Sequence, residues 1–277
     1  EETTQGRDMR QMRTYLAAIT VTLLIGCGGG GGGSSACSTL KINGGESCEE
    51  GVPTVAFVET TYGEDPFVCT GTLISQTAVL TAAHCVTGRP NQIVVAVTGH
   101  VRNASQYFIH PGYRRIQYGS GVGTVFDLAV VKFSEPIPVG PAPILVSKGA
   151  PAPGEQVVAY GFGTDEQGGS LVDRVQSGDA PLKATYLTFA GVNSGLLYET
   201  ISDGSGNTCK GDSGGPILAR NESGQWGIIA LTSFSPLVSN ERPCIPTTGG
   251  TLAVQSSVQN NEAMNFILSV APDAAVN

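Results

Sequence analysis

A single serine stands among glycines in the segment CKGDSGGP, which runs from Cys209 to Pro216. A serine hydroxyl becomes a strong nucleophile when a histidine removes its proton and a carboxylate orients that histidine. The chain has three histidines, His84, His100 and His110, and all of them precede Ser213. The order of these residues along the chain therefore decides which acyl-transfer site the sequence can build.

This order excludes one of two arrangements that fit the serine segment. Residues 211–215 match Gly-x-Ser-x-Gly, the nucleophile elbow of α/β-hydrolases, in which the histidine follows the serine. No histidine follows Ser213, so that arrangement fails. The order His, Asp, Ser remains open, because His84 lies in TAAHC and Asp127 begins DLAVVKF.

Short apolar runs that are broken by turn residues predict an all-β fold for the elements that carry these residues. A first antiparallel set is predicted from VPTVAFVE, FVCTGTLI, TAVLTAAHC, NQIVVAVTGH and FDLAVVKF, with a turn at Ser75 and Gln76. A second set is predicted from EQVVAYGFG, KATYLTF, GPILAR and WGIIALTSF. The passage 135–154 holds six prolines and is expected to connect the two sets.

The end of the chain predicts a helix. Hydrophobic residues recur at helical spacing at Ala263, Phe266, Ile267 and Val270, and Asn260 or Asn261 is the expected cap.

The net charge of -8 argues against nucleic acid as a partner, since proteins that bind nucleic acid carry a basic stripe. The three histidines lack the spacing of metal ligands, so neither a metal nor a cofactor is predicted.

The beginning of the chain predicts an export signal over residues 1–26, with translation starting at Met9 or Met12. Two arginines precede an apolar stretch that is too short to span a bilayer. The stretch ends in Leu-Ile-Gly-Cys, which resembles the lipobox of bacterial lipoproteins, so Cys27 is the expected lipidation site. Residues 27–41 follow as a glycine-rich tether and propeptide. The expected location is the bacterial cell envelope, with the exported chain anchored by lipid.

Three motifs together resemble one family, the trypsin/chymotrypsin-like serine peptidases. They are TAAHC at 81–85, DLAVVKF at 127–133 and GDSGGP at 211–216. The resemblance runs from Ile42 to about Val270. It implies a peptidase domain over 42–277 that consists of two antiparallel six-stranded Greek-key β-barrels, with the active site between them. The expected bounds are about 42–140 for the first barrel, about 147–258 for the second and about 260–271 for the helix.

The resemblance also implies a role for each residue of the site. His84 acts as the base, Asp127 orients the imidazole and Ser213 attacks the substrate carbonyl. The backbone N–H groups of Gly211 and Ser213 form the oxyanion hole. His100 and His110 lie outside the motifs and are expected to be exposed residues at strand ends.

Seven cysteines without a Cys-x-x-Cys pair favour an exported protein with disulfides. The resemblance implies one bridge that ties the histidine loop to the preceding strand and another beside the specificity pocket. With Cys27 lipidated, two cysteines remain and are expected to pair. The expected bridges are Cys69–Cys85, Cys209–Cys244 and Cys37–Cys48.

The segment KINGG at 41–45 resembles the activation site of the family, although Asn43 stands where Val is usual. Cleavage before Ile42 would free an ammonium that pairs with Asp212, the residue before the nucleophile. The uncut chain is expected to be nearly inert. A Cys37–Cys48 bridge would straddle the cut and keep the active enzyme joined to its lipid anchor.

The expected specificity pocket carries no carboxylate. Asn207 takes the position at the base of the pocket, Thr208 lies beside it, and Ser233 and Ser235 form one wall. Gly249 or Gly250 is expected on the far wall, with Gly250 preferred. A neutral or polar side chain of moderate size is therefore predicted for the substrate, and a separate trypsin-like protease for activation. An esterase with the same triad and an inert binding protein on the peptidase fold remain as alternatives.

Overall fold

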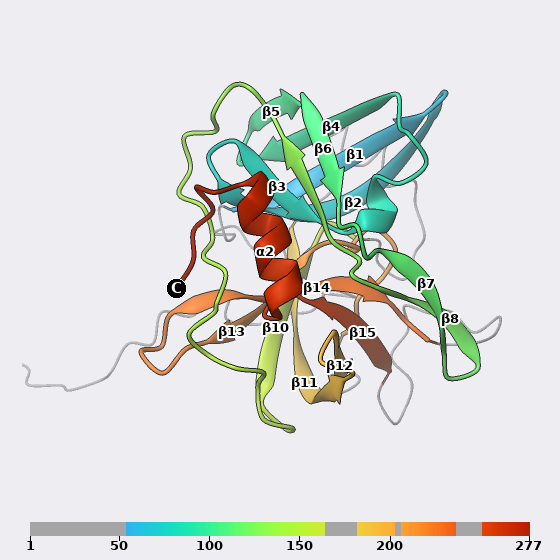
Figure 1. Ribbon diagram of the computed structural model, residues 1–277, viewed down its shortest axis with the longest axis vertical. Helices are drawn as coiled ribbons and strands as arrows, with labels where there is room; N and C mark the ends of the chain where they lie inside the picture. Colours follow the sequence, from blue (N-terminus) through green and yellow to red (C-terminus); the bar gives the residue numbers. More distant parts are fainter. Residues whose placement is uncertain (1–53, 164–181, 203–205, 237–250) are drawn as a thin grey trace, which may run out of the picture. The chain divides into compact units, whose positions relative to one another are not determined.

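A computed structural model describes residues 54–163, 182–202, 206–236 and 251–277 of the chain. All of them belong to the compact unit Ser35–Asn277. Strands dominate these residues, and the only long helix among them is α2 (Asn261–Val270) (Figure 1). Within the described ranges, no helix has the length and apolar character needed to cross a membrane. The all-β fold class predicted from the sequence is confirmed.

Seven strands of the N-terminal half form one antiparallel sheet in the order β5-β4-β1-β2-β3-β9-β6 (Figure 1). This half was predicted to be a six-stranded barrel, but the sheet is not closed, because β5 and β6 lie at its two ends. Strands β5 and β6 were not predicted from the sequence. The bounds are β1 (Val55–Tyr62), β2 (Asp65–Ser75), β3 (Ala78–Thr81), β4 (Gln92–Val97), β5 (His100–Asn103), β6 (Gln106–Ile109) and β9 (Ala129–Lys132).

Six strands of the C-terminal half close into a barrel in the order β10-β11-β12-β15-β14-β13, as the family resemblance implied. The closure removes exposed strand edges and encloses an apolar core that includes Val157, Leu187, Phe189 and Ile217. The bounds are β10 (Gln156–Gly161), β11 (Lys183–Asn193), β12 (Leu197–Ile201), β13 (Pro216–Arg220), β14 (Trp226–Phe234) and β15 (Leu252–Ser257).

A separate two-stranded hairpin precedes Asp127 and consists of β7 (Arg114–Tyr118) and β8 (Gly121–Val125). The sequence did not predict it, because its residues are mostly polar or glycine. The hairpin packs on the C-terminal barrel, where the ring of Tyr118 meets Phe234 edge-on at 5.2 Å between centroids. A Cβ at Gly123 would lie 2.4 Å from the Phe234 ring, so only glycine permits this approach.

Both halves and α2 share one hydrophobic core. It combines Leu80 and Leu128 from the N-terminal half with Ile228 and Leu231 from the barrel and Ile267 from α2. The side chain of Asn260 accepts a hydrogen bond from the N–H of Ala263 and caps the helix, as predicted. The connection 135–154 contains no strand, in agreement with its prolines. Each half also has a core cluster of its own, so this shared cluster joins the two halves rather than replacing their separate cores.

We expect Ile267→Ala to destabilise the fold by about 2–5 kcal/mol, because Ile267 is fully buried where the two halves meet. The free energy of unfolding is measured in urea on a chain that also carries Ser213→Ala, so that self-cleavage cannot interfere. Asn265→Ala, on the exposed side of the same helix, is the control and should change this energy by less than about 0.5 kcal/mol. Equal effects of the two variants would contradict the shared core.

Candidate active site

His84 is held by a short 3-10 helix, η1 (Ala83–Cys85), that follows β3. A disulfide between Cys69 and Cys85 joins this helix to β2, with 6.2 Å between the Cα atoms, and it is the bridge that the resemblance implied. The three side chains of Cys69, His84 and Cys85 lie close together. Because both sulfur atoms are in the disulfide, they cannot act as thiolate ligands, and the cluster is not suited to a metal ion.

The imidazole of His84 contacts the carboxylate of Asp127 directly. Nδ1 of His84 lies 2.7 Å from Oδ2 of Asp127, and the backbone N–H of His84 donates to Oδ1 at 2.9 Å. The two bonds fix the ring and leave Nε2 as the free ring nitrogen. A base that is oriented in this way can take a proton from a hydroxyl group.

Three hydroxyl groups complete the surroundings of Asp127, which is fully buried. Ser233 from β14 donates to Oδ2 at 2.6 Å, and Thr124 from β8 donates to the same atom at 3.3 Å. The hydroxyl of Ser256 in β15 accepts from the backbone N–H of Asp127 at 3.1 Å. Ser233 and Ser256 belong to the C-terminal barrel, so both halves of the fold position this carboxylate.

The pKa values of His84 and Asp127 are shifted in opposite directions. Burial alone would raise the pKa of Asp127 and lower the pKa of His84, because it disfavours both charges. The attraction between the two groups and their hydrogen bonds together outweigh this effect. The pKa of Asp127 is therefore lowered, and the pKa of His84 is raised above 6.5.

Ser213 lies in the loop before β13 and is tied through its backbone to the N-terminal half. Its carbonyl oxygen accepts from the N–H of Thr70 in β2 at 2.9 Å, and Sγ of Cys85 lies 3.7 Å from the same oxygen. Among the described residues, no hydrogen bond joins Oγ of Ser213 to the ring of His84. Such contacts are often long without substrate and tighten when it binds.

The loop around Ser213 depends on glycine. Gly211 has a φ of 96°, and its carbonyl oxygen accepts from the hydroxyl of Thr70 at 2.7 Å. Gly214 also has a positive φ, and a Cβ there would lie 2.2 Å from the hydroxyl oxygen of Thr81. Among the described residues, the N–H groups of Gly211 and Ser213 have no hydrogen-bond partner. Both are thus available to an oxyanion.

Asp212 carries a second fully buried carboxyl group next to Ser213. It accepts hydrogen bonds from the N–H groups of Cys209 at 2.7 Å and Gly163 at 2.8 Å. Burial raises its pKa to about 7, while these two bonds and the charge of Lys183 act in the opposite direction. Ile42, the expected source of its ammonium partner, lies outside the described residues.

A cavity of about 220 Å³ opens beside Ser213. Thr208, Ser233 and Ser235, which were expected in the specificity pocket, line it together with Cys209, Lys210, Thr232 and Phe234. Asn207 is fully buried and is not among the described lining residues, and its side-chain oxygen accepts from the N–H of Thr208 at 2.9 Å. The sequence placed Asn207 at the base of this pocket. Gly250 of the expected far wall lies outside the described residues.

The remaining cysteine predictions fall mostly outside the described part of the chain. Cys209 is disulfide-bonded. Its expected partner Cys244, the expected pair Cys37 and Cys48, and Cys27 all lie outside the described residues.

The prediction for His110 was wrong. It is not an exposed residue at a strand end, because only 4% of its surface is accessible. Its ring stacks on Phe126, the residue before Asp127, with 4.3 Å between the ring centroids. One feature of the sequence could have indicated this burial. His110 directly follows an apolar segment that ends at Ile109, and a residue in that position can lie beside the core as well as at an exposed strand end. Among the three histidines, His100 is partly exposed at the start of β5.

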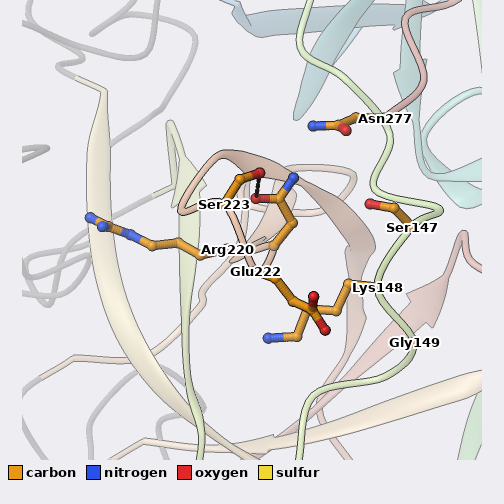
Figure 2. Close-up of a pocket in the computed structure, with 8 residues that line it drawn as sticks. Ser147, Lys148, Gly149, Arg220, Glu222, Ser223 and Asn277 are labelled. Atoms are coloured by element: carbon orange, nitrogen blue, oxygen red, sulfur yellow. Dashed lines mark hydrogen bonds between the residues drawn. The ribbon is translucent and has the colours of Figure 1, made fainter.

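A second cavity of about 720 Å³ lies among Ser147, Lys148, Arg220, Glu222 and Asn277 (Figure 2). Its cations already have partners, since Lys148 pairs with Glu155 and the guanidinium of Arg220 lies 4.6 Å from the centre of the Trp226 ring. None of the residues assigned to catalysis lines it. Of these residues, Ser213 lines the smaller cavity.

We expect Asp127→Asn to lower the pKa of His84, because the carboxylate stabilises the imidazolium and the amide does not. The pKa is measured by NMR titration in a chain that also carries Ser213→Ala. Asp273→Asn is the matched control, since Asp273 is an exposed carboxylate outside the site, and it should leave the titration of His84 unchanged. An unchanged pKa in Asp127→Asn would mean that the two side chains do not interact in solution.

Comparison with known proteins gives one consistent answer. The chain is 28% identical to a trypsin of Saccharopolyspora erythraea over 182 residues, which cover 60% of this chain and 74% of that protein. It is 29% identical to trypsin zeta of Drosophila erecta over 216 residues, or 68% and 75% of the two chains. Ovochymase-2 of Mus musculus is 27% identical over 222 residues, which cover 70% of this chain but only 35% of that longer protein.

Solved structures share the fold. The scabies mite inactivated protease paralogue S-I1 matches with a TM-score of 0.59 at 20% identity and covers 80% of this chain and 95% of its own. HL collagenase matches with a TM-score of 0.58 at 19% identity, over 79% and 94% of the two chains. The profile of the Trypsin family matches residues 42–247. The chain therefore belongs to the trypsin family and has its serine protease fold.

Proposed function

We propose that this chain is a serine endopeptidase that hydrolyses peptide bonds through an acyl-enzyme. The observation that carries the proposal is the bonding of His84 to Asp127, with 2.7 Å between Nδ1 and Oδ2, in a fold that brings the loop of Ser213 against Cys85. Inactive relatives with the same fold are known, as the name of the scabies mite paralogue states, so the fold alone does not carry the proposal.

In the proposed reaction, Oγ of Ser213 attacks the carbonyl carbon and its proton passes to Nε2 of His84. Asp127 stabilises the imidazolium that forms. The negative oxygen of the tetrahedral intermediate accepts hydrogen bonds from the N–H groups of Gly211 and Ser213. His84 then gives its proton to the leaving amine, the C–N bond breaks, and a water molecule releases the acyl group by the same steps.

We further propose that the protein is made as a zymogen, activated by a separate trypsin-like protease at the bond between Lys41 and Ile42. The match to the family profile begins at Ile42, which agrees with a mature domain that starts there. The carboxyl group of Asp212 is fully buried with a pKa near 7. A new ammonium beside it would favour the charged form and offset the cost of burial.

We also propose that the protein stays at the bacterial cell envelope. A signal peptide at 1–26, lipidation of Cys27 and a Cys37–Cys48 bridge across the activation site would together keep the cut enzyme on the membrane. The pocket beside Ser213 is lined by three serines, two threonines and one phenylalanine, in addition to Cys209 and Lys210. This lining supports a preference for neutral or polar side chains of moderate size in polypeptide substrates.

We expect a fluorophosphonate probe to label Ser213 only after limited treatment with trypsin, because the ammonium of Ile42 completes the site. Sequencing of the new N-terminus verifies the cut, and Ser213→Ala is the control that should never be labelled. Peptide amides, esters and whole proteins are then compared as substrates. Hydrolysis of esters alone would favour an esterase.

A chain that starts at Ile42 and is still not labelled would instead indicate a binding protein on a peptidase fold.

The proposed bridge across the activation site is tested by gel electrophoresis of the cut protein. On gels without reductant, the short N-terminal piece should stay with the activated protein, and it should separate once reductant is added. Release without reductant would contradict the Cys37–Cys48 bridge.

A further inference from the structure

A strained backbone conformation directly precedes Asp127. Phe126 has a φ of 50°, in the left-handed region that bulky residues rarely adopt. This conformation is unfavourable for a bulky side chain and persists only where the surrounding structure holds it. The carbonyl oxygen of Phe126 accepts a hydrogen bond from the N–H of Leu128 at 2.8 Å. Asp127 is thus the central residue of a tight turn that begins at Phe126.

The ring of Phe126 is buried against His110. The two rings are nearly parallel, with 4.3 Å between centroids and 5° between planes, and 5% of Phe126 is exposed. A Cβ at Gly112 would lie 2.8 Å from the Phe126 ring and 3.1 Å from Nδ1 of His110. Glycine at this position therefore leaves space for the stack.

His110 is itself fixed on several sides. The N–H of Gly112 donates to Nδ1 at 3.0 Å, so Nε2 carries the proton and donates to the carbonyl oxygen of Glu262 at 3.3 Å. Glu262 lies in the first turn of α2, and Phe266 of the same helix meets the His110 ring edge-on at 5.0 Å. The backbone N–H of His110 donates to Leu128, beyond the turn. Hydrogen bonds and a ring contact thus join the helix, the histidine and the turn.

We propose that Phe126 and His110 are positioning residues for the catalytic pair. Their stack holds Phe126 in the left-handed conformation and thereby aims the Asp127 carboxylate at both the backbone N–H and Nδ1 of His84. This inference rests on the proposed peptidase function and adds to it two residues that lie outside the catalytic motifs. The role proposed for both residues is positioning, with no contact to substrate and no part in proton transfer.

The size of the expected effect follows from geometry. Asp127 accepts bonds at 2.7 Å and 2.9 Å from His84, and both require the carboxylate to keep its place. A displacement of about 1 Å in a catalytic group can lower the rate about 100-fold. If the Phe126 ring is lost, the strain in its backbone is no longer opposed and the turn can relax.

The test compares Phe126→Leu with Phe133→Leu in the activated full-length enzyme. Both phenylalanines are buried in the N-terminal half, but Phe133 packs in the sheet core away from the turn. We expect Phe126→Leu to lower kcat about 10- to 100-fold with KM within about twofold, when kcat is expressed per titrated active site. Phe133→Leu should leave both constants nearly unchanged, even if it lowers the thermal midpoint as much.

Variants of His110 separate the stack from the hydrogen bonds. His110→Phe keeps a ring against Phe126 and should retain kcat within about threefold, whereas His110→Ala should behave like Phe126→Leu. Equal kcat values in Phe126→Leu and Phe133→Leu would overturn the proposal. Retention of full kcat by His110→Ala would overturn the part assigned to His110.

A second readout does not require activity. In chains with Ser213→Ala, NMR titration should show a lower pKa for His84 in Phe126→Leu than in Phe133→Leu, because a displaced Asp127 stabilises the imidazolium less. The same pKa in both variants would overturn the inference. If the wild-type chain proves inactive, this titration still decides whether Phe126 positions Asp127, so failure of the proposed function is distinguished from failure of the inference.

Discussion

The burial of the Asp127 carboxylate is the constraint on which the site depends. A charged group with no access to water is tolerated only when its oxygens are well bonded. Here His84 bonds to both oxygens and the hydroxyls of Thr124 and Ser233 to one of them. These groups come from a 3-10 helix, a hairpin and a barrel strand, so the carboxylate is satisfied only when all three elements are assembled.

The same requirement explains why the two halves behave as one body. Thr70 in β2 donates through its N–H to Ser213 and through its hydroxyl to Gly211, and its hydroxyl accepts from the N–H of Phe162. A single residue of the N-terminal sheet thus contacts the loop of the proposed nucleophile and the end of β10. The core beneath it, which includes Ile267 of α2, is common to both halves.

The sequence predicted the residues of the site better than their surroundings. The motifs around His84, Asp127 and Ser213 are local, so their order and spacing indicated both the chemistry and the fold. The partners of Asp127 could not be found in this way, because Ser233 and Ser256 lie more than 100 residues away and nothing local marks them. Ser233 was expected to line the pocket, which it does, but its bond to Asp127 was not predicted.

Two further differences have physical reasons. The hairpin β7–β8 has little alternation of apolar residues, since it is stabilised by packing of Tyr118 on Phe234 and by the hydrogen bond from Tyr118 to Glu199. His110 was expected at the surface because it carries no catalytic motif. Its burial follows from contacts with Phe126 and Phe266, which are distant in sequence from one another and meet only in the folded protein.

The division of the site between two sheets has a consequence for how substitutions act. The N-terminal half contributes His84 and Asp127, whereas the C-terminal barrel contributes Ser213 and every residue that lines the adjacent pocket. Substitutions in the pocket can therefore alter its lining without touching the His84–Asp127 pair. Ser233 is the exception, because it lines the pocket and also donates a hydrogen bond to Asp127. A substitution there would change both the pocket and the surroundings of the carboxylate.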